Sequence, residues 1–179
     1  TKLNSRGELL LRGQESEQAD EKDSLQLQVH RMLEDGLPFH IRTRLELKIS
    51  GKSRQLLLGQ VLPTGLTPLE ASSKLSYSFA SDYSLTVQAK PGEYLLDIDS
   101  VLPAPPERLQ APDNHSPGWP KEEVWVWSPS ESLRSVEISG APQIDSQRTT
   151  LPEHWKSYAS YLIRPVDTLQ LTQTRRGEE

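Results

Sequence analysis

Hydrophobic and polar residues alternate along much of the chain, most clearly between Phe39 and Ile49. There the odd positions are apolar, with Thr43 as the exception, and the even positions are polar or charged. A period of two predicts a β-strand with one buried face and one face in water. Shorter segments repeat the pattern, and we expect further strands at 25–32, 55–61, 75–79, 85–89, 94–98, 123–127, 133–138, 161–163 and 169–171.

Turn signals connect these strands. Glu34-Asp35-Gly36 predicts a hairpin between the first two strands, and Pro91-Gly92 fits a type II turn, which predicts a hairpin between 85–89 and 94–98. Thr150-Leu151-Pro152-Glu153 has the pattern of a capping box, which predicts one short helix near 151–157. The expected fold is therefore all-β: a mainly antiparallel β-sandwich of jelly-roll or immunoglobulin-like type with that one helix.

The expected domain organisation is a polar N-terminal segment, 1–24, followed by one β-sandwich at 25–177. A short strand bracketed by glycines is expected at 7–13, and residues 14–24 have almost nothing to bury. Six prolines between 103 and 120 predict a long crossover without regular structure. The alternative is two subdomains, 25–102 and 122–177. Because the chain starts without Met and stops without a closing element, we expect it to be a piece of a longer protein.

Composition narrows the function classes. Hydrophobic residues make up 34% of the chain and charged residues 25%, which suits a thin sandwich whose strands each give half their residues to water. The net charge of -5 argues against a general nucleic-acid binder, which needs Lys and Arg to neutralise phosphates. The absence of cysteine excludes disulfides, thiol nucleophiles and zinc-thiolate sites. No apolar run has the length needed to cross a bilayer, so we expect no direct membrane insertion by this segment.

Catalytic and metal-binding signatures are missing from the sequence. It contains neither a Gly-x-Ser-x-Gly elbow nor a His-Glu-x-x-His pair. His30 and His40 occupy the polar phase of neighbouring strands and could approach each other, but no third ligand is spaced with them. We therefore expect no enzyme, no cofactor and no metal.

Two groups of residues are candidates for binding. His40, Arg42 and Arg44 lie on the wet face of the long strand, where they could bind an anionic glycan, a headgroup or an acidic partner, or pair with charges across the sheet.

The second group is aromatic. Trp125 and Trp127 are two residues apart on a strand and must share a face, with Trp119 shortly before them. Exposed tryptophans can stack on sugar rings, but aromatic side chains are more often core residues. We expect at least one of Trp125 and Trp127 to be mostly buried.

Several motifs resemble a segment of large, uncharacterised envelope-associated proteins of proteobacteria. The similarity covers about 25–177 and rests on these motifs: Asp35-Gly36-Leu37-Pro38, Glu123-Val124-Trp125, Val136-Glu137-Ile138-Ser139-Gly140, Thr150-Leu151-Pro152-Glu153-His154-Trp155 and Thr174-Arg175-Arg176-Gly177. The resemblance implies a periplasmic or extracellular location and transfers no site residues.

The function expected from all this is a non-catalytic interaction or spacer domain of a larger cell-envelope protein. Its partner would be a protein or a glycan of the envelope. The alternative is a carbohydrate-binding module that uses surface tryptophans.

Overall fold

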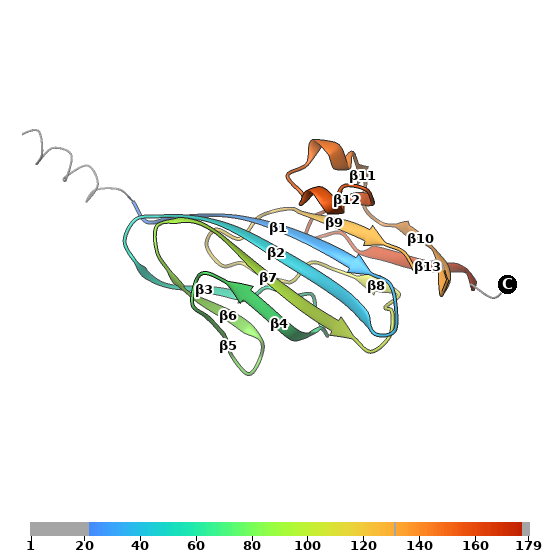
Figure 1. Ribbon diagram of the computed structural model, residues 1–179, viewed down its shortest axis with the longest axis horizontal. Helices are drawn as coiled ribbons and strands as arrows, with labels where there is room; N and C mark the ends of the chain where they lie inside the picture. Colours follow the sequence, from blue (N-terminus) through green and yellow to red (C-terminus); the bar gives the residue numbers. More distant parts are fainter. Residues whose placement is uncertain (1–21, 131, 177–179) are drawn as a thin grey trace, which may run out of the picture.

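Three long antiparallel strands form the centre of the fold in the computed structural model, which describes residues 22–130 and 132–176 (Figure 1). They are β1 (Ser24–Glu34), β2 (Phe39–Ser50) and β7 (Gly92–Leu102). The β1–β2 hairpin predicted from Glu34-Asp35-Gly36 is confirmed, with Glu34 opposite His40 and Ser24 opposite Ser50. The strand predicted at 7–13 and most of the N-terminal segment at 1–24 lie outside the described residues.

These strands belong to a seven-stranded sheet with the order β11-β12-β9-β1-β2-β7-β4. The additional strands are β4 (Thr67–Ser73), β9 (Glu123–Ser128), β11 (Gln143–Ile144) and β12 (Ala159–Ile163). All neighbours pair antiparallel except β1 and β9, which run parallel. Strands from before and after the proline-rich segment therefore share one sheet.

Two smaller sheets form the second layer. One has the order β3-β6-β5 and the other the order β10-β13-β8, and they lie toward opposite ends of the long strands (Figure 1). Their strands are β3 (Arg54–Gln60), β5 (Tyr77–Phe79), β6 (Ser84–Ala89), β8 (Arg108–Leu109), β10 (Arg134–Ser139) and β13 (Leu169–Arg176).

The core lies between the layers. Phe39, Ile41 and Leu45 of β2 are fully buried, and they share one apolar cluster with Val87 of β6 and Leu171 of β13. The all-β, mainly antiparallel sandwich expected from the sequence is thus confirmed. On β2, the predicted burial of Ile41, Leu45, Leu47 and Ile49 is confirmed as well. Arg42 and Lys48 are exposed as predicted, whereas Arg44 is half-buried.

The predicted hairpin around Pro91-Gly92 is wrong. β6 pairs with β3 and β5, whereas β7 pairs with β2 and β4, so the turn carries the chain from one layer to the other. The period-two pattern describes each strand correctly but does not say which sheet a strand joins.

The predicted helix near 151–157 is also wrong in detail. Within 151–157 the structure has one single-turn 3-10 helix, η2 (Glu153–Trp155), and a second one, η1 (Ser146–Arg148), precedes it. Pro152 precedes η2 and makes no side-chain cap, while the Thr150 hydroxyl donates to Gln28 Oε1 instead. Because its hydroxyl is used by the sheet, Thr150 does not cap a helix.

Candidate functional site

The outer face of the seven-stranded sheet carries rows of paired charges. The even positions of β2 point outward, and Arg44 holds Asp97 of β7 through two bonds, Nε–Oδ1 at 2.8 Å and Nη2–Oδ2 at 3.0 Å. Two residues before Arg44 on β2, Arg42 makes a similar pair. Its Nη1 lies 3.7 Å from Asp99 Oδ2, and its Nε donates to Glu34 Oε1 at 3.0 Å. The hydrogen bond to Glu34 raises the pKa of Arg42, and the one to Asp97 raises the pKa of Arg44.

His40 belongs to the same rows. Its Nδ1 lies 2.9 Å from Asp99 Oδ1. Each of the three predicted binding residues on the long strand, His40, Arg42 and Arg44, thus has a carboxylate partner across the sheet. The arrangement is the cross-strand pairing that the sequence left open as an alternative to a free basic stripe.

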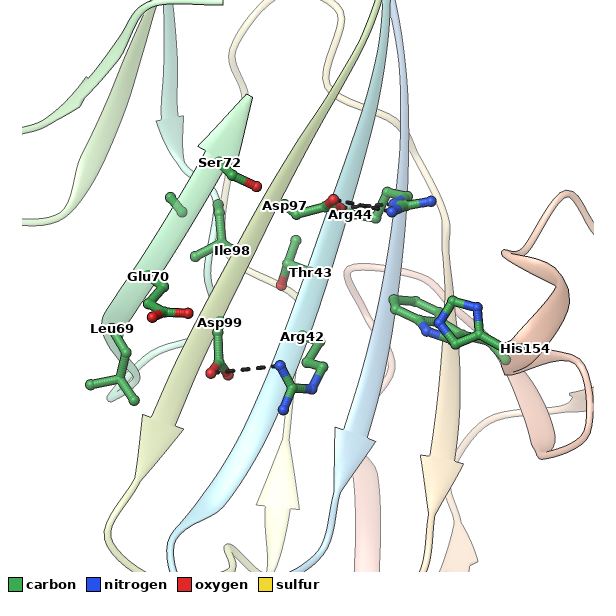
Figure 2. A pocket seen from close by; sticks show the side chains of 12 residues that line it. Arg42, Thr43, Arg44, Leu69, Glu70, Ser72, Asp97, Ile98, Asp99 and His154 are labelled. Carbon is green, nitrogen blue, oxygen red and sulfur yellow. Dashed lines mark hydrogen bonds and ion pairs between the residues drawn. The ribbon is translucent and has the colours of Figure 1, made fainter. Parts of the chain in front are cut away.

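A hollow of about 640 Å³ lies over these rows (Figure 2). Leu69, Glu70 and Ser72 of β4 form one side of it, and His154 forms the other. Arg42, Arg44, Asp97 and Asp99 lie on the floor between them. We call the surface formed by the outward residues of β2, β7 and β4 the open face.

A second hollow, of about 620 Å³, continues the open face toward the other end of β2. It is lined by Gln28, Glu46, Lys48, Leu95 and Thr150, among others. Leu95 and Leu69 are exposed, at 45% and 56%, and are the large apolar side chains that the open face shows to solvent. Val101 of β7 also lies on this face and is half-buried.

The other half of the outer face is covered by the chain itself. Leu151 and Trp155 pack on Met32 of β1 and Val126 of β9, and all four are buried. The covering residues belong to the segment 145–158, which contains both 3-10 turns and lies over β9 and β12 (Figure 1). This segment also supplies His154 to the first hollow and Thr150 to the second.

The tryptophans lie in the core and not on the surface. Trp125 is 0% and Trp127 7% exposed, which confirms the expected burial, and the indole of Trp125 donates to Glu123 Oε1 at 2.7 Å. Trp119 is half-buried and packs against the same core. Both indoles lie between the two layers, so a sugar platform built on Trp125 and Trp127 would require them to leave the core.

The inner face of the sheet contains a charge network that the sequence reasoning missed. The Arg31 guanidinium donates to Glu123 at 2.6 and 3.3 Å and to Thr43 Oγ1 at 2.9 Å, and all three residues are buried. The sequence did contain a signal for this network. Thr43 is the single polar residue among the apolar positions of β2, and Arg31 likewise occupies an apolar position of β1.

His30 and His40 are not brought together. In the β1–β2 register His30 stands opposite Arg44, whereas His40 stands opposite Glu34. His30 is 3% exposed, and burial, with a smaller contribution from the Arg44 charge, lowers its pKa to about 4. Its Nδ1 lies 3.1 Å from Glu46 Oε2 but is not aligned for a hydrogen bond. Burial in turn raises the pKa of Glu46.

Among 22–130 and 132–176, no group of three or more His, Cys, Asp or Glu side chains is placed to hold a metal ion. The same part of the chain has no helix whose length and apolarity would let it cross a membrane.

Comparison with protein-family models gives no match, and comparison with curated proteins gives none either. Among solved structures, the chain is similar to a two-domain M1 zinc metallopeptidase bound to L-tryptophan, with a TM-score of 0.41 and 10% identity over 83% of this chain and 43% of that chain. For the M1 zinc metallopeptidase of Deinococcus radiodurans bound to a Tyr-Ser-Ala substrate, the TM-score is 0.42 at 10% identity over 83% and 42%. The chain spans less than half the length of these structures, and a likeness this weak carries no argument.

Proposed function

We propose that this chain is a non-catalytic interaction domain of a larger cell-envelope protein and that it meets its partner through the open face. The observation that carries the proposal is a difference in coverage between the two halves of the outer sheet face. The half over β1 and β9 is sealed by Leu151 and Trp155, while the half over β2, β7 and β4 is left open and hollowed.

The side chains of the open face suit binding. Asp97 and Asp99 are both held by cations of β2, so their carboxylates are fixed in place as hydrogen-bond acceptors. Fixed side chains lose little conformational entropy when a partner docks. The envelope setting, on its periplasmic or extracellular side, is supported by the resemblance of residues 25–177 to envelope-associated proteins, and the partner is a protein or a glycan of that compartment.

A module that binds sugars through Trp125 and Trp127 is the weaker candidate. Both indoles would have to leave the core, where they pack with Phe39 and Tyr161. Truncating or exposing a buried tryptophan typically costs about 3–5 kcal/mol.

Site-specific crosslinking in the intact full-length protein tests the proposal. Leu69 on the open face and Val166 in the turn between β12 and β13 are both exposed apolar residues, at 56% and 79%. Each is replaced in turn by p-benzoylphenylalanine, and cells are irradiated. We expect a discrete adduct from position 69 and none from the matched position 166. Equal adducts from both positions, or neither a protein nor a glycan adduct from position 69, would contradict the proposal.

A further inference from the structure

We propose that the hollow between β4 and His154 takes a neutral, polyhydroxylated ligand: a segment of a glycan chain without net charge. This inference rests on the proposed function, since it names the partner class of the same open face. It differs from the tryptophan platform in both place and chemistry, because the binding groups are ion-paired polar side chains.

The charge of the hollow favours a neutral ligand. Two arginines, Arg42 and Arg44, face three carboxylates, those of Glu70, Asp97 and Asp99. A polyanion would have to compete with Asp97 and Asp99 for the guanidinium groups, and a polycation would have to compete with the guanidinium groups for these two carboxylates. A ligand without charge leaves every pair intact.

The hydrogen-bonding groups fit hydroxyls. A sugar hydroxyl both donates and accepts, and the hollow offers donors on Arg42 and Arg44 next to acceptors on Asp97 and Asp99. Successive side chains on one face of a strand lie roughly 7 Å apart, which is on the scale of one pyranose unit. Because the Arg44–Asp97 pair is bidentate, both planar groups are held in position before any ligand arrives.

A protein partner fits the hollow less well. The central part of a protein interface is apolar and depleted of charged residues, and desolvating ion pairs is expensive. Here the floor is charged, and the exposed large apolar side chain among the lining residues is Leu69, since Trp155 is only 6% exposed. A glycan replaces water on such a surface with hydroxyls of similar chemistry, so the ion pairs keep a polar environment.

Calorimetric titration of the chain with defined hexasaccharides tests the inference. The neutral probes are chitohexaose, cellohexaose and maltohexaose, and the charged probe is hexagalacturonate. We expect at least one neutral probe to bind with a dissociation constant below about 1 mM, and the anionic probe to bind at least about tenfold more weakly. Failure of all three neutral probes to bind at about 10 mM, or tighter binding of hexagalacturonate, would overturn the inference.

Two matched variants locate the site. Ser72→Tyr fills the hollow from β4, whereas Ser78→Tyr places the same side chain on exposed Ser78 of β5, in the other layer. The first should abolish binding of the neutral probe and the second should leave it unchanged. Amide resonances of the unaltered chain give a reading that does not depend on folding of a variant: the probe should shift signals of β2, β4 and β7. Shifts centred on β3, β5 and β6 would refute the placement.

The outcomes separate this inference from the proposed function. A protein adduct from position 69 together with no binding of any hexasaccharide would leave the interaction domain standing and remove the glycan. No adduct and no binding would remove both.

Discussion

A buried ion pair connects β1 and β9 in the core. Arg31 of β1 and Glu123 of β9 are 0% and 3% exposed and form a two-point ion pair between the parallel strands, and Trp125 adds a third hydrogen bond to Glu123. A pair of this kind adds little net stability compared with apolar residues of the same size, but breaking it is costly. Its geometry fixes the register in which the strand after the proline-rich segment joins β1.

Glu123→Leu should therefore destabilise the chain strongly. It leaves the Arg31 guanidinium buried without its carboxylate, a change that typically costs about 3–5 kcal/mol in the free energy of unfolding. The double variant Arg31→Met with Glu123→Leu should recover most of that loss, as measured by urea denaturation. A loss below about 1 kcal/mol in the single variant would mean that Arg31 finds water or another partner.

His30 should make stability depend on pH. Its pKa is about 4 in the folded chain and about 6.5 when unfolded. The unfolded chain then binds more protons between these values, so stability is full above pH 6.5 and falls as the pH drops toward 4, by up to about 3 kcal/mol. Glu46 has a raised pKa and opposes this trend, because the folded chain binds its proton first.

His30→Gln removes the contribution of His30 to the pH dependence and leaves that of Glu46. This variant should flatten the loss of stability between pH 6.5 and 4 in urea melts recorded at each pH. An unaltered pH profile in the variant would show that other groups cause the dependence.

At the scale of elements, one edge strand of the large sheet, β4, and one edge strand of a small sheet, β3, are blocked. β4 is an edge strand that carries Pro68 and a register shift between Pro68 and Glu70, and Tyr77 Oη donates to Ala71 O at 2.6 Å. β3 is another edge, and side chains of the proline-rich segment hydrogen-bond to it. Blocked edges discourage strand pairing between molecules, which favours the open face over an edge as the contact surface.

Asn114 is the main block on β3. Its amide donates to Leu58 O at 2.7 Å and to Gln60 O at 2.6 Å. Asn114→Ala should cost about 1–3 kcal/mol because it removes the amide donor to both carbonyls, of which only Leu58 O keeps a side-chain donor, the Ser116 hydroxyl. Asp113→Ala is the neighbouring control: its side chain is 91% exposed, and we expect an effect within about 0.5 kcal/mol in the same chemical melts. Equal effects of the two variants would contradict the role of Asn114.

Period-two alternation predicted the long strands, because each has one face in the core. It did not find β4, since Pro68 reads as a break, yet proline is tolerated at a sheet edge. It could not assign β6 and β7 to different layers, because Pro91-Gly92 suits either connection. The candidate site was found in part: His40, Arg42 and Arg44 were predicted, but Asp97 and Asp99 come from a strand whose neighbour the sequence did not reveal.

At the scale of the whole molecule, both sides of the proline-rich segment contribute to one core. β9 lies between β1 and β12 in the large sheet, and β13 supplies Leu169 and Leu171 to the cluster that contains Leu45. The segment 103–120 has a single two-residue strand, β8, and otherwise no helix or strand in the structure. One sandwich with this segment as a crossover stays a prediction, and the shared core supports it over two subdomains.

Cleavage within the crossover should therefore not separate the chain. A protease site introduced at exposed Pro103 and Ala104 should be cut, and the two pieces should stay together in gel filtration under native conditions. They should part only in denaturant. Recovery of a folded 122–179 fragment on its own would support two subdomains instead.

We propose that the open face is the surface through which this chain meets its partner. Thiol labelling tests this role most directly, because the sequence has no cysteine and one introduced thiol is unique in the chain. Ser72→Cys on the open face and Ser78→Cys on β5 are labelled with a maleimide, first in the purified chain and then in the full-length protein in the cells that make it, and labelling is read on the peptides that contain the introduced thiols. We predict that labelling at position 72 becomes much slower in the cells while labelling at position 78 keeps its rate. Equal rates at position 72 in both settings would contradict the claim.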